Sequence, residues 1–116
     1  MTSPEAPTVA PADGTLGVLC VGLGAVTTTL IADVELTKRG LGVPVGSLTQ
    51  MGTIRIGKRT DANVPRIQDF VPLARLDDLV FGGWDIFEQD CYRSALQAGV
   101  LEPALLERVR DDLEAI

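Results

Sequence analysis

The chain has 116 residues, of which 46% are hydrophobic and 22% are charged, so it is long enough for one domain and too short for two. Sixteen acidic residues against ten basic ones give a formal charge of −6, which makes nucleic acid and anionic membranes poor candidate partners. The sequence has no histidine, and its only cysteines, Cys20 and Cys91, lie far apart, so we expect neither a metal site nor a histidine base. Two reduced thiols favour a cytoplasmic protein.

The first 14 residues contain three prolines, two acids and small residues, a composition that cannot bury enough apolar surface to order itself. We therefore predict a disordered tail over residues 1–14 and one ordered unit over residues 15–116. Residues 15–32 carry no charge and approach the length of a membrane-spanning helix. Their three glycines and their acidic flank are untypical of a membrane span or a signal peptide, so we predict a strand followed by a buried helix.

Three elements are predicted in the first half of the ordered unit. Leu16–Val21 is a short apolar run ending at Gly22, which predicts a strand buried on both faces of a parallel sheet. Over residues 25–39 apolar side chains recur at helical spacing and charges occur only in the later turns, so a helix is predicted. Residues 43–50 alternate weakly and include a proline, which indicates an exposed or edge strand.

The pattern in the next segment is weaker. Residues 54–60 resemble a short extended piece with a basic end, and residues 61–65 are typical of a turn. Residues 77–81 are apolar after two acids and lead into Gly82 and Gly83, so they are the second predicted buried strand. The glycine pair at the predicted end of this strand permits close backbone approach.

Two helices are predicted to close the chain. Residues 88–98 form helices well and end at Gly99, and Pro103 suits the first turn of a helix reaching about Leu113. The order of strand, helix, strand and helices predicts an α/β protein with a Rossmann-like parallel sheet and flanking helices. The length favours one structural unit or a piece of a larger one.

The strongest local motif is the glycine turn that follows the first strand and opens the first helix. Gly22 lets the chain turn, Gly24 lets backbone amides approach a pyrophosphate, and the helix starting near Ala25 presents free N–H groups to an anion. Thr27 or Thr28 offers an additional hydroxyl donor. However, Thr27 replaces the third glycine of the usual fingerprint, and no acid follows about twenty residues later. Glycines that serve packing alone therefore stay an open alternative.

A second motif places a carboxylate after the glycine pair of the second strand. Asp85 is positioned to accept hydrogen bonds from ribose hydroxyls. The competing interpretation is that Asp85 caps a helix starting near Phe87 and that Trp84 fills the core. The spacing alone leaves both interpretations open.

Three strings, GLGAVTTT, GSLTQMGTIRIGKR and DLVFGGWDIF, stand in the order found in the myo-inositol-1-phosphate synthase family. The resemblance covers roughly residues 16–101, and the short glycine loop resembles that of the bacterial branch. By this resemblance the chain carries the N-terminal NAD-binding part of such a synthase, which implies an incomplete dinucleotide-binding domain. The residues implied in NAD binding are Gly22, Leu23, Gly24, Ala25, Val26 and Thr27 at the pyrophosphate and Asp85 and Ile86 at the adenosine ribose. Ser47, Thr49 and Gln50 are implied to shape the neighbouring loop.

The family converts glucose 6-phosphate to 1D-myo-inositol 3-phosphate (L-myo-inositol 1-phosphate) for inositol and phospholipid biosynthesis. The resemblance implies oxidation by NAD, enolisation, aldol cyclisation and reduction by the same cofactor, in a cytoplasmic homotetramer classed among isomerases. It also implies that the catalytic residues lie beyond Ile116, so the chain alone is expected to be inactive. Within the chain Lys38, Arg55, Lys58 and Arg59 are the nearest candidates for phosphate contacts, although such exposed side chains are usually solvated.

Two alternatives differ from the synthase in class. One is a fragment of another NAD-linked oxidoreductase or epimerase, and the other is a non-catalytic nucleotide-binding module. In each case half of a doubly wound sheet leaves a strand edge and an apolar helix face uncovered. We therefore expect the isolated chain to be marginally stable or to associate.

Overall fold

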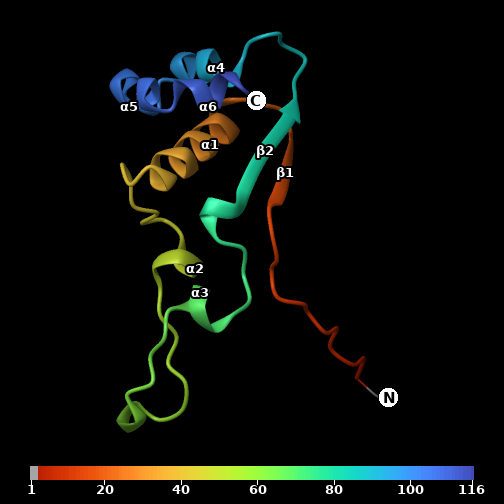
Figure 1. Cartoon of the computed structure of the whole chain (residues 1–116), viewed down its shortest axis with the longest axis vertical. Coiled ribbons are helices and arrows are strands. Elements are labelled where there is room, and N and C mark those ends of the chain that lie inside the picture. Colours follow the sequence, from red (N-terminus) through yellow and green to blue (C-terminus); the bar gives the residue numbers. More distant parts are fainter. Residues whose placement is uncertain (1–2) are drawn as a thin grey trace.

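A computed structural model describes residues 3–116, and its central feature is a two-stranded parallel sheet with helices on one side (Figure 1). β1 (Leu16–Val21) pairs with β2 (Leu79–Trp84) in a register that runs from Leu16 opposite Leu79 to Val21 opposite Trp84. The first strand has the predicted bounds, because an apolar run closed by a glycine is a strong local signal. The α/β class with a parallel sheet and flanking helices is confirmed.

The second strand differs from the prediction at both ends. It starts at Leu79, after the short turn η2 (Leu76–Asp78), and it includes Gly82 and Gly83 instead of ending before them. A Cβ atom on Gly83 would lie 2.4 Å from the Cys20 carbonyl oxygen, so a glycine lets the two strands approach. The sequence predicts that the two glycines follow the strand. In the structure they lie within it, and Gly83 lets the strand approach β1 closely.

Helix α1 (Ala25–Lys38) follows β1 and packs on one face of the sheet, as predicted to within one residue. It ends near Gly40, whose φ of +72° suits glycine at a helix terminus. The Lys38 Nζ donates to the Glu35 carboxylate at 3.2 Å and to the Leu79 carbonyl oxygen. This lysine therefore ties the end of α1 to the start of β2.

The C-terminal helices form a layer over α1, and the core lies between them (Figure 1). They are α4 (Cys91–Ala98), α5 (Pro103–Arg108) and α6 (Arg110–Glu114). The buried cluster comprises Ile31, Ala32, Leu36, Cys91, Ala95, Leu106, Val109 and Leu113. The single helix predicted from Pro103 is divided at Val109, whose φ of −122° and ψ of 18° depart from helical values.

Between α1 and β2 the chain makes a long excursion, and here the predicted strand over residues 43–50 is wrong. Residues 43–47 form a turn in which the Ser47 N–H donates to the Pro44 carbonyl oxygen at 3.0 Å, and α2 (Leu48–Met51) follows. Pro44 lacks the N–H that a strand ladder needs, and the Ser47 carbonyl oxygen accepts the first hydrogen bonds of α2.

The excursion continues as a hairpin-like arm. Thr53 bridges Arg66 in antiparallel fashion, and the Ile54 N–H donates to the Pro65 carbonyl oxygen at 3.0 Å. The short turn η1 (Arg59–Asp61) forms its tip, and α3 (Ile67–Phe70) returns beside α2. The extended piece predicted over residues 54–60 is confirmed only for its first part, which forms one side of the arm. The turn predicted over residues 61–65 is misplaced, because the tip lies at residues 59–61 and residues 63–65 form the returning side.

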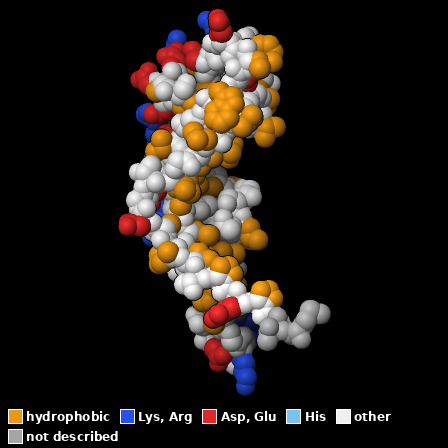
Figure 2. Space-filling view, turned by 90° about the vertical axis from the view of Figure 1, so that its right-hand side faces the viewer, with side chains coloured by type: hydrophobic (Ala, Val, Ile, Leu, Met, Phe, Trp, Pro, Cys, Tyr) orange, Lys and Arg blue, Asp and Glu red, His pale blue; other side chains and the backbone are white. Residues whose placement is uncertain are grey.

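One face of the sheet is bare within the described part of the chain. Leu19, Val21 and Trp84 are 73%, 80% and 57% exposed, and Figure 2 shows hydrophobic side chains gathered along this side of the molecule. The prediction of strands buried on both faces is therefore wrong for residues 3–116, because α1 covers only one face. Figure 1 shows that the helices all lie on that side of the two strands.

The N-terminal residues lie apart from the sheet. Residues 3–15 form no helix or strand and are exposed, and residues 1 and 2 of the predicted tail lie outside the described part. The disorder of this tail stays a prediction. Among residues 3–116 no helix has the length and apolar character needed to cross a membrane.

Candidate dinucleotide site

The turn between β1 and α1 has the geometry that its glycines predict. The Gly22 N–H donates to the Trp84 carbonyl oxygen at 2.8 Å, so Gly22 extends the pairing of the two strands. Glycine adopts its φ of +93° without the steric strain that a side chain would cause. Leu23 follows, and Gly24 occupies the position that begins α1. The chain therefore passes from strand to helix within three residues.

The start of α1 offers donors to an anion. The first helical hydrogen bond runs from the Thr28 N–H to the Gly24 carbonyl oxygen at 3.0 Å, so the amides of residues 25–27 precede the helix ladder. They carry the positive end of the helix dipole. A Cβ atom on Gly24 would meet nothing within 4 Å, so the space beside this backbone is open. The arrangement fits a pyrophosphate group.

The threonines at this helix start have different environments. Thr28 is fully buried, and its hydroxyl donates to the Gly24 carbonyl oxygen at 2.8 Å, so it is not the additional ligand donor that the sequence offered. Thr29 donates in the same way to Ala25 at 2.6 Å. Thr27 is half-buried and remains the candidate hydroxyl.

Asp85 joins the two predicted motifs. Its Oδ2 accepts a hydrogen bond from the Leu23 N–H at 2.7 Å, across 62 positions of sequence, and its Oδ1 accepts one from the Phe87 N–H at 3.2 Å. The alternative in which Asp85 caps a helix near Phe87 is wrong, because α4 starts at Cys91 and Asp90 caps it through the Arg93 N–H at 2.7 Å. Trp84 is exposed and does not fill the core.

The hydrogen bonds to Asp85 stabilise its charged form. The Leu23 N–H, and after it the Phe87 N–H, hold the pKa of the Asp85 carboxyl below its usual value of 3.8. Each carboxylate oxygen keeps a second lone pair, so the same group can still accept a hydroxyl hydrogen. The Leu23 N–H, however, is already donated to Asp85. An anion beside the loop is therefore left with the amides from Gly24 onward.

A pH dependence follows from this carboxyl. Its pKa is lower in the folded chain than in the unfolded chain, so its hydrogen bonds stabilise the fold above the unfolded pKa, and this contribution is lost as the pH falls through the folded pKa. We expect acidification below about pH 4 to lower the urea midpoint of the wild-type chain more than that of Asp85→Asn. The carboxyl-carbon chemical shift of Asp85, followed by NMR, should give an apparent pKa below 3.8. A value at or above 3.8 would contradict the assignment of both hydrogen bonds.

A pocket of about 230 Å³ lies beside the loop. Its lining consists of Leu23, Gly24, Asp85, Phe87, Gln89, Ser94 and Gln97. The Ser94 Oγ donates to the Leu23 carbonyl oxygen at 2.8 Å, so α4 also contacts the glycine turn. Ile86, which lies in the sequence between the pocket residues Asp85 and Phe87, is 89% exposed. The glutamines and Ser94 carry no sequence motif, and a serine within a helix gives no signal that would have identified it.

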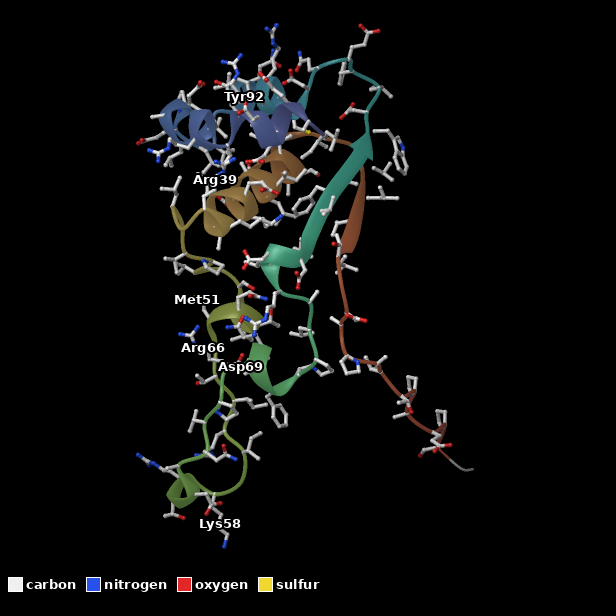
Figure 3. The ribbon with its side chains drawn as sticks, viewed as in Figure 1. Arg39, Met51, Lys58, Arg66, Asp69 and Tyr92 are labelled. Atoms are coloured by element: carbon white, nitrogen blue, oxygen red, sulfur yellow. The ribbon has the colours of Figure 1, made fainter. Side chains whose placement is uncertain are left out.

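Other candidates from the sequence lie elsewhere. Figure 3 shows Lys58 at the tip of the hairpin-like arm, at the opposite end of the molecule from α4, and Arg55 and Arg59 belong to the same arm. Lys38 lies at the far end of α1 from Gly24. These four cations are therefore not brought to the glycine turn.

The polar residues around α2 are also separate from the turn. Ser47, Thr49 and Gln50 do not line the pocket beside Gly24. Ser47 lines a larger cavity of about 510 Å³ between α1 and residues 41–47, whose walls are mostly apolar. The Ser47 and Thr49 hydroxyls lie 3.3 Å apart. In this structure the three residues shape the excursion and not the glycine turn.

Comparison with known proteins decides the family. Residues 16–116 match the family model of the NAD-binding domain of myo-inositol-1-phosphate synthase. The chain belongs to this family. These findings confirm the predicted resemblance to the synthase family and the Rossmann-like NAD-binding domain. They also confirm NAD as the cofactor of that domain.

Individual synthases agree with the family match. The chain is 47% identical over 109 residues to inositol-3-phosphate synthase 1 of Bacteroides thetaiotaomicron, covering 93% of this chain and 25% of that protein. It is 34% identical over 113 residues to inositol-3-phosphate synthase isozyme 1 of Arabidopsis thaliana, covering 87% and 22%. The crystal structure of the Caenorhabditis elegans inositol-3-phosphate synthase superposes with a TM-score of 0.75 at 27% identity, covering 92% and 23%. The chain thus spans about a quarter of the length of these relatives.

Proposed function

We propose that this chain binds NAD for an inositol-3-phosphate synthase, with its pyrophosphate at the glycine turn and its adenosine ribose at Asp85. The observation that carries the proposal is the 2.7 Å hydrogen bond between Asp85 and Leu23, which joins the two motifs at the same end of the sheet. In open α/β sheets, ligands bind beyond the carboxyl ends of the strands. Both motifs follow the carboxyl ends of β1 and β2.

Each proposed contact has a physical basis. The amides of Gly24, Ala25, Val26 and Thr27 hold the pyrophosphate, and the first of these residues leaves the space beside it open. Gly22 makes the turn, and Leu23 connects it to Asp85. The free lone pairs of Asp85 accept ribose hydroxyls. The exposed Ile86 offers an apolar surface to the adenosine.

The reaction belongs to the intact synthase. Glucose 6-phosphate is its substrate, and bound NAD supplies a hydride acceptor that later returns the hydride, so that the net reaction is an isomerisation. The role of this chain is to bind and orient the nucleotide. Groups that stabilise the enolate and the substrate phosphate are supplied by other parts of the synthase, which we propose to be a cytoplasmic homotetramer.

Calorimetric titration of the chain with NAD tests this proposal. We expect wild-type chain to bind NAD and Asp85→Asn to bind it about tenfold more weakly or worse, because a neutral amide accepts hydroxyl hydrogens less strongly than a carboxylate does. Asp69→Asn is the matched control, since Asp69 is exposed on α3 and lies away from the turn (Figure 3). It should bind as the wild type does. A folded chain that binds no NAD, or equal affinities for Asp85→Asn and wild type, would refute the proposal.

A further inference from the structure

Leu23, the middle residue of the glycine turn, is held at three points. Its N–H donates to Asp85 Oδ2 at 2.7 Å, and its carbonyl oxygen accepts from Ser94 Oγ at 2.8 Å. Its side chain packs against the buried core cluster. Because glycines flank it on both sides, these contacts restrict a segment that would otherwise sample many backbone conformations.

The two hydrogen bonds orient two successive peptide units. Asp85 holds the unit between Gly22 and Leu23, and Ser94 holds the unit between Leu23 and Gly24. No peptide bond among the described residues is cis. In a planar trans peptide the C=O and N–H point in opposite directions, so fixing the Leu23 oxygen toward α4 aims the Gly24 N–H away from α4.

We infer that Ser94 is a positioning residue for the dinucleotide, acting through the direction of the Gly24 N–H. This inference rests on the proposed NAD site and adds a residue outside both motifs. Ser94 lies on α4, whose start is fixed by Asp90 and whose Cys91 and Ala95 are buried in the core. Because these contacts hold α4 in place, the Ser94 hydroxyl fixes the position of the glycine turn relative to the helix. Binding then needs less ordering of the loop.

The test uses the 116-residue chain and three variants. Ser94→Ala removes the hydroxyl without disturbing the helix, Ser94→Thr restores an Oγ donor, and Ser47→Ala removes a serine hydroxyl from a segment away from the turn. We expect Ser94→Ala to weaken NAD binding about two- to tenfold, as the loss of one neutral hydrogen bond predicts. Ser94→Thr should recover most of the affinity, and Ser47→Ala should match the wild type.

A second measurement separates this inference from the proposed function. In nucleotide-free chain the NMR amide resonance of Gly24 should move in Ser94→Ala and return toward its wild-type position in Ser94→Thr. A Gly24 amide that stays in place, or unchanged NAD affinity in Ser94→Ala, would overturn the positioning role while leaving the NAD site intact. Failure of the wild-type chain to bind NAD would overturn the proposed function and this inference together.

Discussion

Replacing Gly24 with valine is expected to abolish measurable NAD binding while leaving the chain folded. Gly24 has a φ of −85° and a ψ of −162°, which any residue adopts, and a Cβ atom added to it would meet no atom within 4 Å. The branched side chain would instead fill the space beside the first amides of α1. Losing two charge-assisted hydrogen bonds, each about 1.5–3 kcal/mol, corresponds to roughly a hundredfold or greater loss of affinity.

Calorimetry with NAD and urea unfolding of the same variant measure the two parts of this expectation. Valine is a poorer residue than glycine at the start of a helix, so the free energy of unfolding should fall by about 1 kcal/mol. Gly17→Val is the control, because Gly17 also has open space around it and lies at the other end of β1. A Gly24→Val chain that binds NAD normally would exclude the helix start as the pyrophosphate site. Equal losses in both variants would indicate a general effect on the fold.

Gly22 is a less informative position for the same experiment. Its φ of +93° lies in a region where a side chain is strained, at a cost of about 1–2 kcal/mol. A substitution there changes the turn itself and the strand pairing made by the Gly22 N–H. Loss of NAD binding would then have two causes, whereas Gly24 separates ligand space from backbone strain.

Features encoded by neighbouring residues were predictable from the sequence. The bounds of β1, the extent of α1 and the glycine turn between them all follow from a short apolar run, helical spacing and glycine positions. The end of α4 at Gly99, whose φ is +66°, is of the same kind. Each of these features is determined by residues that lie close together in the sequence.

Features set by contacts between distant segments were not predictable. Gly83 looked like the end of a strand, but its role depends on the Cys20 carbonyl oxygen on another strand. The bare face of the sheet departs from the expected two-sided burial because burial depends on which elements lie above the strand. In both cases the sequence is compatible with two structures, and the segment that packs against these residues decides between them.

The candidate site shows the same division. The glycine turn and Asp85 were identified from motifs, but the choice between ribose contact and helix cap required the positions of Leu23 and Asp90. Ser94 was missed altogether, since its only distinction is a hydrogen bond across 71 positions of sequence. Motifs indicate which residues matter, and the fold determines what holds them in place.

The second large effect is on stability and concerns Leu106. This side chain is fully buried in the cluster between α1 and the C-terminal helices, which is the core of the chain because one sheet face is bare. Leu106→Ala should therefore lower the free energy of unfolding by about 2–5 kcal/mol, from lost burial and the cavity left behind. The total free energy of unfolding of a native protein is only about 5–15 kcal/mol, so a large fraction of this variant should be unfolded.

Leu105 provides the matched control, since it is the preceding residue of the same helix and is 38% exposed. Leu105→Ala makes the same chemical change at an exposed position of α5, and we expect a loss below about 1 kcal/mol. Urea midpoints followed by circular dichroism compare the two variants directly. If both lose the same stability, the packing of α5 against α1 is not the main support of the fold. A large difference would show that the packing of α5 against α1 is a main support of the fold, as the burial of Leu106 predicts.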